Sequence, residues 1–188
     1  TNVLSTFLLA SLLTPMMTKT AQIGTPECSS EFKPHIVLLN SDAHLAANFS
    51  QKDAPVIYDS LNEPHNFDGY ERYRTTKLMG LLLLPQLCSS SSEKGNDEVI
   101  ICAVNPGFCK SEKVKKLPNW NRRFLYRCFA ITTAEAAENI VWACLEDAIP
   151  SGSYVRNRAV SWSNPSCGQK RASSLRNCPK SSPIRLHL

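Results

Sequence analysis

The stretch His35-Ile36-Val37-Leu38-Leu39-Asn40-Ser41 decides the fold. An apolar run that ends in polar residues is typical of a buried parallel strand that delivers a polar side chain at its carboxyl end. A second run, Val99-Ile100-Ile101-Cys102-Ala103-Val104, repeats the pattern and ends in Asn105-Pro106-Gly107. The apolar segment over residues 70 to 88 between the two runs reads as a helix. Strand, helix and strand in this order predict a right-handed parallel unit, whose carboxyl edge is the usual ligand site of such sheets.

The predicted helix carries Tyr73 and Lys77, and residues four apart lie on one helical face. An ammonium close to a phenol stabilises the phenolate by Coulomb attraction, so such a pair can serve as a proton donor near neutral pH. A tyrosine and a lysine at this spacing also occur by chance on many helices. The position of the pair, between a strand that ends in Ser41 and a strand that ends in Asn-Pro-Gly, makes it a candidate site.

These pieces, in this order, resemble the short-chain dehydrogenase/reductase family, and the resemblance covers about residues 1 to 156. The gap of 32 positions between Ser41 and Tyr73 is longer than in most of the family and is similar to that of retinol-dehydrogenase-like and related fungal members. The resemblance implies an α/β chain that forms the C-terminal catalytic half of a doubly wound parallel-sheet, Rossmann-like fold.

The resemblance also implies a reaction, which is reversible hydride transfer between NADP(H) or NAD(H) and a carbonyl or alcohol substrate. Tyr73 would donate the proton, Ser41 would hold the carbonyl oxygen, and Lys77 would favour the phenolate and bind the nicotinamide ribose. Asn2 would complete a proton relay. The implied catalytic residues are Tyr73, Lys77, Ser41 and Asn2, and the implied cofactor contacts are Tyr73, Lys77, Asn105, Pro106, Gly107 and Ser111. Neither the substrate nor the choice between NADP and NAD follows from these residues.

The glycines depart from the family pattern, which places a glycine-rich pyrophosphate turn and a ribose-binding acid on a first strand. The seven glycines of this chain are never closer than eleven positions apart. We therefore expect an N-terminally truncated chain that lacks the nucleotide-binding strands and leaves a sheet edge unpaired. The first residue, Thr1, is not Met, which is expected for a fragment or a processed product. The alternative is a truncated, non-catalytic remnant that acts only through dimerisation or another protein contact.

Two apolar segments are expected to form buried helices, over residues 1 to 15 and 70 to 88. Pro15 is expected to end the first helix and Pro85 to kink or end the second. The family dimerises through the corresponding helices, so a homodimer is possible. Residues 1 to 17 are too short and too polar for a membrane span, and a signal peptide would need a basic start and a cleavage site that are missing.

The charge is concentrated at the end of the chain. Lys and Arg exceed Asp and Glu by 21 to 16, and five basic residues follow residue 160, where there is no acid. We therefore predict a catalytic half over residues 1 to 160 and a basic, disordered tail over residues 161 to 188. The balanced body gives little support for nucleic-acid binding, although the tail could be a nucleic-acid-binding arm.

The eight cysteines show no metal-ligand spacing, which predicts no metal site and a reduced, cytoplasmic setting. Cys102 and Cys144 lie in apolar runs and are expected in the core. Thr132 and Glu135 predict a capping box for a helix whose apolar stripe is Ala137, Ile140, Val141, Cys144 and Leu145.

Two further segments leave alternatives open. Residues 112 to 131 are basic and aromatic and fit either a substrate lid or a solvated amphipathic helix. Asp42 and His44 follow Ser41, which suggests a catalytic triad, but Ser41 lacks a Gly-x-Ser-x-Gly turn and solvated loop residues are the favoured interpretation.

Overall fold

A four-stranded sheet forms the centre of the computed structural model, which describes residues 2–23, 33–92, 99–109 and 130–163. Its strand order is β1-β2-β3-β4. The strands are β1 (His35–Leu39), β2 (Ile100–Asn105), β3 (Ser153–Arg156) and β4 (Ala159–Ser163). The first three are parallel and β4 is antiparallel to β3. The expected α/β class and the two parallel strands are thus confirmed.

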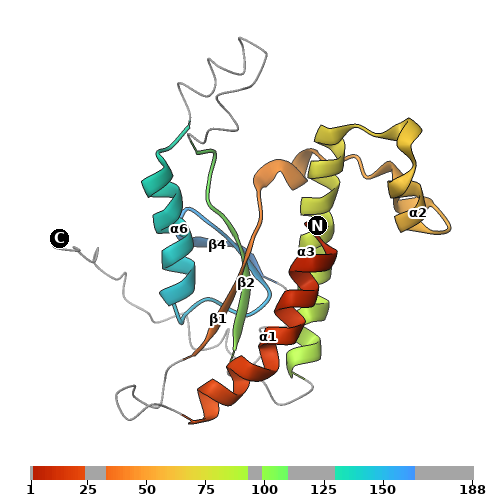
Figure 1. The fold of residues 1–188 in the computed structure, drawn as a ribbon. Helices are drawn as coiled ribbons and strands as arrows, with labels where there is room; N and C mark the ends of the chain where they lie inside the picture. Colours follow the sequence, from red (N-terminus) through yellow and green to blue (C-terminus); the bar gives the residue numbers. More distant parts are fainter. Residues whose placement is uncertain (1, 24–32, 93–98, 110–129, 164–188) are drawn as a thin grey trace.

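Helices cover both faces of the sheet (Figure 1). The helices α1 (Leu4–Ile23) and α3 (Gly69–Ser92) lie on one face, and α6 (Thr133–Leu145) lies on the other. Alternate strand residues supply the two cores, as expected from the pleat. Ile36, Ile101 and Tyr154 pack with Leu84 of α3, whereas Ile100, Cys102 and Val155 pack with Ala143 of α6.

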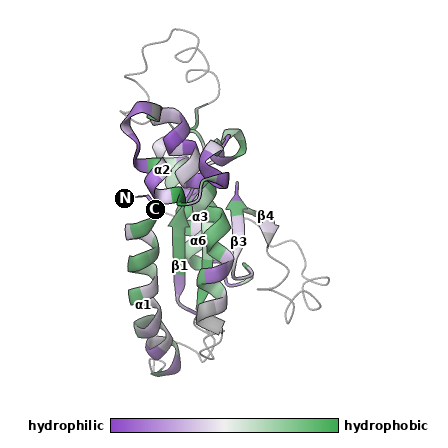
Figure 2. Ribbon diagram, turned by 90° about the vertical axis from the view of Figure 1, so that its right-hand side faces the viewer, coloured by the Kyte–Doolittle hydropathy of each residue, from purple (hydrophilic) through white to green (hydrophobic). Residues whose placement is uncertain are grey.

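The helix α1 differs from its prediction in length and in burial. It continues through Pro15 to Ile23. Its inner residues Ala10, Thr14 and Thr18 are buried, and the free energy of this burial offsets the loss of the one backbone hydrogen bond that proline cannot donate. Its outer face is exposed and apolar, and comprises Leu4, Leu8, Leu9, Leu12 and Met16. Figure 2 shows this hydrophobic colouring along α1. We call these five residues the outer face of α1.

The helix α3 also continues past its proline, Pro85, and ends at Ser92. Beyond the proline it still places Leu87 and Cys88 in the core, and their burial favours a continued helix over a break. Residues 93–98, which follow α3, lie outside the described ranges.

The insertion between Ser41 and Tyr73 folds into short elements, which are η1 (Asp42–Ala46), η2 (Ser50–Asp53), α2 (Ile57–Asn62) and η3 (Pro64–Asn66). It is largely hydrophilic (Figure 2). Glu71 of α3 holds it by accepting hydrogen bonds from the backbone N–H groups of Asn48 and Phe49, at 2.6 and 3.1 Å. The insertion is therefore anchored to the helix that carries Tyr73.

The capping box of α6 is confirmed, because Thr132 accepts from the Glu135 N–H while Glu135 accepts from the Thr132 N–H. The predicted apolar stripe of this helix is wrong except at Ile140, which is partly buried against the core. The buried residues are Ala136, Asn139 and Ala143, while Val141 and Leu145 are exposed.

The predicted boundary at residue 160 falls inside β4, so residues 161–163 form part of the sheet and the other tail residues lie outside the described ranges. At the opposite side, β1 is the edge strand of the described sheet. Within the described ranges no helix combines the length and the apolar character needed to cross a bilayer.

The thiols of Cys102 and Cys144 should differ in reactivity. Cys102 is fully buried, as expected, and burial raises the pKa of its thiol to about 12, with smaller contributions from Cys144 and Cys88. Cys144 is exposed, contrary to expectation, and partial desolvation raises the pKa of its thiol less. Because the thiolate is the reactive form, iodoacetamide at pH 8 should modify Cys144 and leave Cys102 unmodified. Peptide mass spectrometry measures both, and equal labelling in the absence of urea would contradict the buried position of Cys102.

Candidate active site

The carboxyl ends of β1 and β2 lie side by side and bring two predicted segments together. Leu39 pairs with Val104, and the Asn40 N–H extends the pairing by donating to the Val104 carbonyl at 2.8 Å. Ser41 follows directly on β1, and Asn105-Pro106-Gly107 ends β2. The predicted strand order therefore places Ser41 and the Asn-Pro-Gly turn side by side at the carboxyl ends of the strands.

Two hydrogen bonds run between Lys77 of α3 and the end of β1. The Lys77 Nζ donates to the Leu39 carbonyl at 2.9 Å, and the Asn40 Nδ2 donates to the Lys77 carbonyl at 3.2 Å. Burial lowers the pKa of the Lys77 ammonium from its ordinary value of 10.5. The ammonium is thereby held at the end of the strand that leads into Ser41.

The Tyr73 ring lies beside this ammonium, with the Lys77 Nζ 5.7 Å from the ring centroid. At this distance the cation interacts favourably with the ring. Tyr73 is 42% exposed, so its side chain is accessible to a small molecule. The pair thus shares one face of α3, as the spacing predicts.

Ser41 caps the short helix η1 with an extended backbone, and its Oγ accepts from the Ala43 N–H at 3.2 Å. Its own N–H donates to the Asn40 Oδ1 at 2.7 Å. A hydroxyl that accepts from the backbone still has a proton to donate. Ser41 can therefore offer a hydrogen bond to a carbonyl oxygen.

Asn2 is exposed at the start of α1, where its Nδ2 donates to the Thr76 Oγ1 at 3.2 Å. Thr76 adjoins Lys77 in the chain, so Asn2 contacts the helix beside the pair. Among the described residues its side chain makes no hydrogen bond with Tyr73 or Lys77 themselves. A relay role for Asn2 stays a prediction.

The Asn105-Pro106-Gly107 turn is fixed by side chains from two elements. The Asn105 Oδ1 accepts from the Gly107 N–H at 3.0 Å, and Asn139 of α6 donates to the Pro106 carbonyl at 2.9 Å. Gly107 has a φ of +96°, in the left-handed region that favours glycine. Ser111, the last predicted cofactor contact, lies outside the described residues.

Gly107→Ala should destabilise the chain by about 1–3 kcal/mol, because a strained backbone carries a cost of this order. In addition, an added Cβ would lie 2.8 Å from the Ile131 Cδ1. Gly69→Ala is the matched control, because its Cβ would meet only the Phe67 ring at 3.8 Å and its helical position favours alanine. Urea unfolding of both variants measures the difference. An equal stability of the two would contradict the described geometry of the turn.

Three further residues support the site, of which the sequence singled out only Asp42, as a solvated loop residue. Asn40 bridges Ser41 and Lys77, as described above, and Asp42 and Tyr154 meet on the other side of Ser41, where the Tyr154 hydroxyl donates to the Asp42 Oδ1 at 2.7 Å. Burial and then the Asp42 hydrogen bond raise the pKa of Tyr154 well above its ordinary value. Asp42 is therefore not a free solvated loop residue. The sequence signal that could have indicated Asn40 and Asp42 is their position as polar residues on either side of Ser41.

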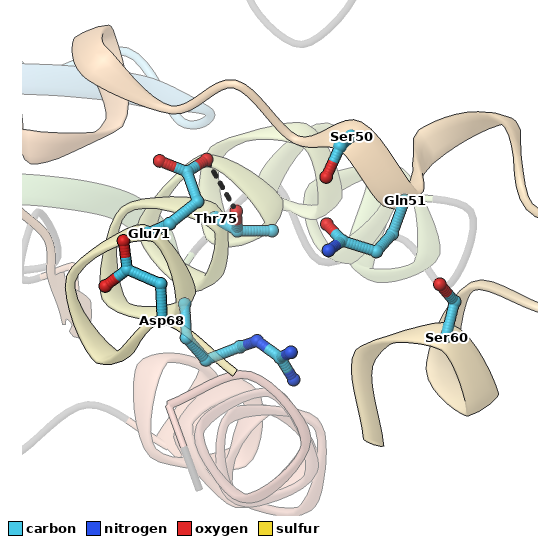
Figure 3. A pocket seen from close by; sticks show the side chains of 7 residues that line it. Ser50, Gln51, Ser60, Asp68, Glu71 and Thr75 are labelled. Atoms are coloured by element: carbon cyan, nitrogen blue, oxygen red, sulfur yellow. Dashed lines mark hydrogen bonds between the residues drawn. The ribbon is translucent and has the colours of Figure 1, made fainter. Parts of the chain in front are cut away.

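A polar hollow of about 430 Å³ lies on a different face of α3 (Figure 3). Its lining residues are Ser50, Gln51, Ser60, Asp68, Glu71, Arg72 and Thr75. Figure 3 shows Thr75 hydrogen-bonded to Glu71 inside it. Neither Tyr73 nor Lys77 lines this hollow, so it is separate from the candidate site.

Metal ligation has no support in the described ranges, where no group of three or more His, Cys, Asp or Glu side chains is arranged to hold an ion.

Comparison with known proteins finds relatives over most of the chain. Short chain dehydrogenase sol3 of Alternaria solani is 34% identical over 155 residues, which are 82% of this chain and 50% of the relative. Short chain dehydrogenase FGM9 of Gibberella zeae is 29% identical over 164 residues, which are 85% of this chain and 46% of the relative. The chain thus spans about half the length of the curated relatives that it matches.

A solved structure shares the fold. The NADPH-bound carbonyl reductase from chicken fatty liver superposes with a TM-score of 0.54 at 16% identity, covering 87% of this chain and 54% of that protein. No protein-family model matches the sequence.

Proposed function

Because the chain belongs to the short-chain dehydrogenase/reductase family over the part that it shares with these relatives, we propose that it supplies the catalytic centre of a nicotinamide-dependent oxidoreductase. The observation that carries this proposal is the position of Lys77. Its Nζ donates a hydrogen bond to the carbonyl of Leu39, which ends β1 and lies two residues before Ser41. The same Nζ lies beside the Tyr73 ring.

The proposed reaction is reversible reduction of a carbonyl to an alcohol. Ser41 donates a hydrogen bond to the carbonyl oxygen, which gains negative charge as the carbonyl carbon is reduced. Tyr73 transfers its phenolic proton to that oxygen, and the Lys77 ammonium stabilises the phenolate that remains. Asn2 is proposed to link the site to solvent through the Thr76 segment. In the direction of alcohol oxidation the same groups act in reverse.

The residues of the described site fit the nicotinamide end of NADP(H) or NAD(H), which would supply or accept the hydride. The proposed contacts are between the Lys77 ammonium and the nicotinamide ribose, and between the nicotinamide and the partly exposed Pro106 and Gly107, whose neighbour Asn105 is buried. Phosphate binding in such folds uses a glycine-rich turn at a helix N-terminus, and the glycine spacing of this sequence provides none. The sequence therefore gives no basis for choosing between the two cofactors.

The alternative function, a non-catalytic role through protein contacts, is favoured by the outer face of α1. Its four leucines and Met16 are each more than half exposed. An apolar surface of this kind marks an interaction site. A homodimer formed through α1 and α3 is the corresponding proposal, and it is compatible with catalysis.

Cofactor binding separates the two proposals. We consider a fusion enzyme that joins the chain to the part of the Alternaria solani relative that it does not match. Isothermal titration should give a micromolar or lower dissociation constant for NADPH or NADH with the fusion enzyme. The 188-residue polypeptide alone should bind each cofactor at least tenfold more weakly, because it lacks the phosphate contacts. A loss of about 1.4 kcal/mol of binding free energy already lowers affinity tenfold. A fusion enzyme that is folded but binds neither cofactor would favour the non-catalytic alternative.

A further inference from the structure

Tyr154 of β3 lies beneath the loop that begins at Ser41. This residue is 5% exposed and packs in the core with Ile36, Leu38 and Leu84. Its hydroxyl reaches the sheet edge and donates to the Asp42 Oδ1 at 2.7 Å. A hydrogen bond to a carboxylate is stronger than one between neutral groups. A rigid core residue therefore holds the residue next to Ser41.

Two more contacts hold the same loop. Arg156 lies 3.3 Å from the Asp42 Oδ2, and the His44 ring meets the Tyr154 ring edge-on with centroids 5.2 Å apart. The His44 Nδ1 is also 2.7 Å from the Ser41 carbonyl oxygen. The polar contacts of Asp42 with Tyr154 and Arg156, and the ring contact of His44 with Tyr154, thus tie the loop to the strand β3.

These anchors matter because η1 has no buried residue of its own. The turn also lies against α3, and Asn40 joins Ser41 to Lys77, so the contacts of Asp42 are what tie the turn to β3. The Ser41 Oγ is bound within this turn, to the Ala43 N–H. The direction of the Ser41 hydroxyl therefore depends on where Asp42 is held.

We propose that Tyr154 is a positioning residue that acts through Asp42 to aim the Ser41 hydroxyl at the carbonyl oxygen shared with Tyr73. This inference rests on the proposed oxidoreductase function. The Asn105 side chain also faces the Tyr154 hydroxyl, while its Oδ1 keeps the bond to the Gly107 N–H. The turn at the end of β2 therefore retains a support that does not need Tyr154.

Tyr154→Phe in the fusion enzyme removes only the hydroxyl and keeps the packed ring. We expect kcat to fall by about 10- to 100-fold, the effect of misplacing a group that orients the substrate. KM for the carbonyl substrate should rise, while the dissociation constant for NADPH stays unchanged. Tyr70→Phe, the same substitution at a half-exposed tyrosine in the first turn of α3, is the control and should leave kcat and KM unaltered.

Variants of Asp42 separate positioning from a general structural role. Asp42→Asn keeps an oxygen that accepts from Tyr154 and should retain most of kcat, whereas Asp42→Leu should reproduce the Tyr154→Phe defect. The double variant Asp42→Leu and Tyr154→Phe should be no worse than Asp42→Leu alone, because Asp42→Leu already removes the hydrogen bond that Tyr154→Phe breaks, together with the Arg156 contact. Additive losses, or a lower melting temperature with unchanged kcat and KM, would overturn the proposal.

An inactive wild-type fusion enzyme would overturn the proposed function, and a second measurement then decides the contact by itself. Hydrogen exchange in the 188-residue chain should show faster exchange of the Ala43 N–H in Tyr154→Phe than in Tyr70→Phe. Equal exchange rates in these two variants would overturn the positioning role whatever the activity of the fusion enzyme.

Discussion

Tyr73→Phe should lower the turnover number of the fusion enzyme by about 10²–10⁴-fold, the range that a positioned proton donor contributes. Phenylalanine keeps the ring beside the Lys77 ammonium and loses only the proton that the carbonyl oxygen needs. The dissociation constants for NADPH and NADH should be nearly unchanged. Steady-state kinetics over aldehydes, ketones and secondary alcohols, with titration of each cofactor, measures both quantities.

The control for this variant is Tyr70→Phe, which removes a phenol one helical turn earlier on α3. It should turn over at the wild-type rate. If Tyr73→Phe retains wild-type turnover, the proton donor is another group and the roles proposed for Lys77 and Ser41 lose their basis.

Lys77→Met should reduce both turnover and cofactor affinity. The ammonium lies 5.7 Å from the centre of the Tyr73 ring, and one charge at that distance contributes about 3 kcal/mol at an effective dielectric constant near 20. The expected loss in turnover is therefore roughly 10²-fold. The loss in affinity follows from the proposed contact with the nicotinamide ribose.

The pH dependence gives this prediction a second readout. Burial lowers the pKa of Lys77, so its charge is lost at a lower pH than that of a free lysine, and wild-type turnover should fall correspondingly early on the alkaline side. Lys77→Arg keeps its charge to higher pH and should move that fall upward. Lys52→Met, on η2 in the insertion, is the matched control and should change neither turnover nor affinity. An alkaline fall that stays in place in Lys77→Arg would contradict the role of the ammonium.

The central strands and the Tyr73 helix could be predicted because their residues leave few alternatives. The run Ile36 to Leu39 is apolar throughout, which suits a strand covered on both faces. The capping box at Thr132 is an equally specific local signal, since two side chains must satisfy each other's backbone donors.

The burial of α1 and α6 could not be predicted from the same kind of pattern. The segment that forms α1 is apolar on all sides, so periodicity does not show which face is buried. In α6 small residues such as Ala136 and Ala143 face the sheet because they allow close packing, while the larger Val141 lies outside. The strand β4 was missed because its alternating residues merge with a serine-rich segment.

The candidate site could be predicted only where its residues form a local pattern in the sequence. Tyr73, Lys77 and Ser41 follow a spacing that can be read along the chain. Tyr154 is 112 residues from Asp42, and no local pattern joins two positions so far apart. Its contribution emerges only once the parallel register places β3 beside β2.

The measurement that tests the catalytic centre most directly is transfer of deuterium from the nicotinamide C4 position of NADPH or NADH to a carbonyl substrate, read by mass spectrometry of the alcohol product. The wild-type fusion enzyme should form the deuterated alcohol, and Tyr73→Phe should form it at least about 10²-fold more slowly. Equal transfer by the two proteins, or no transfer by a folded wild-type enzyme that binds the cofactor, would contradict the account.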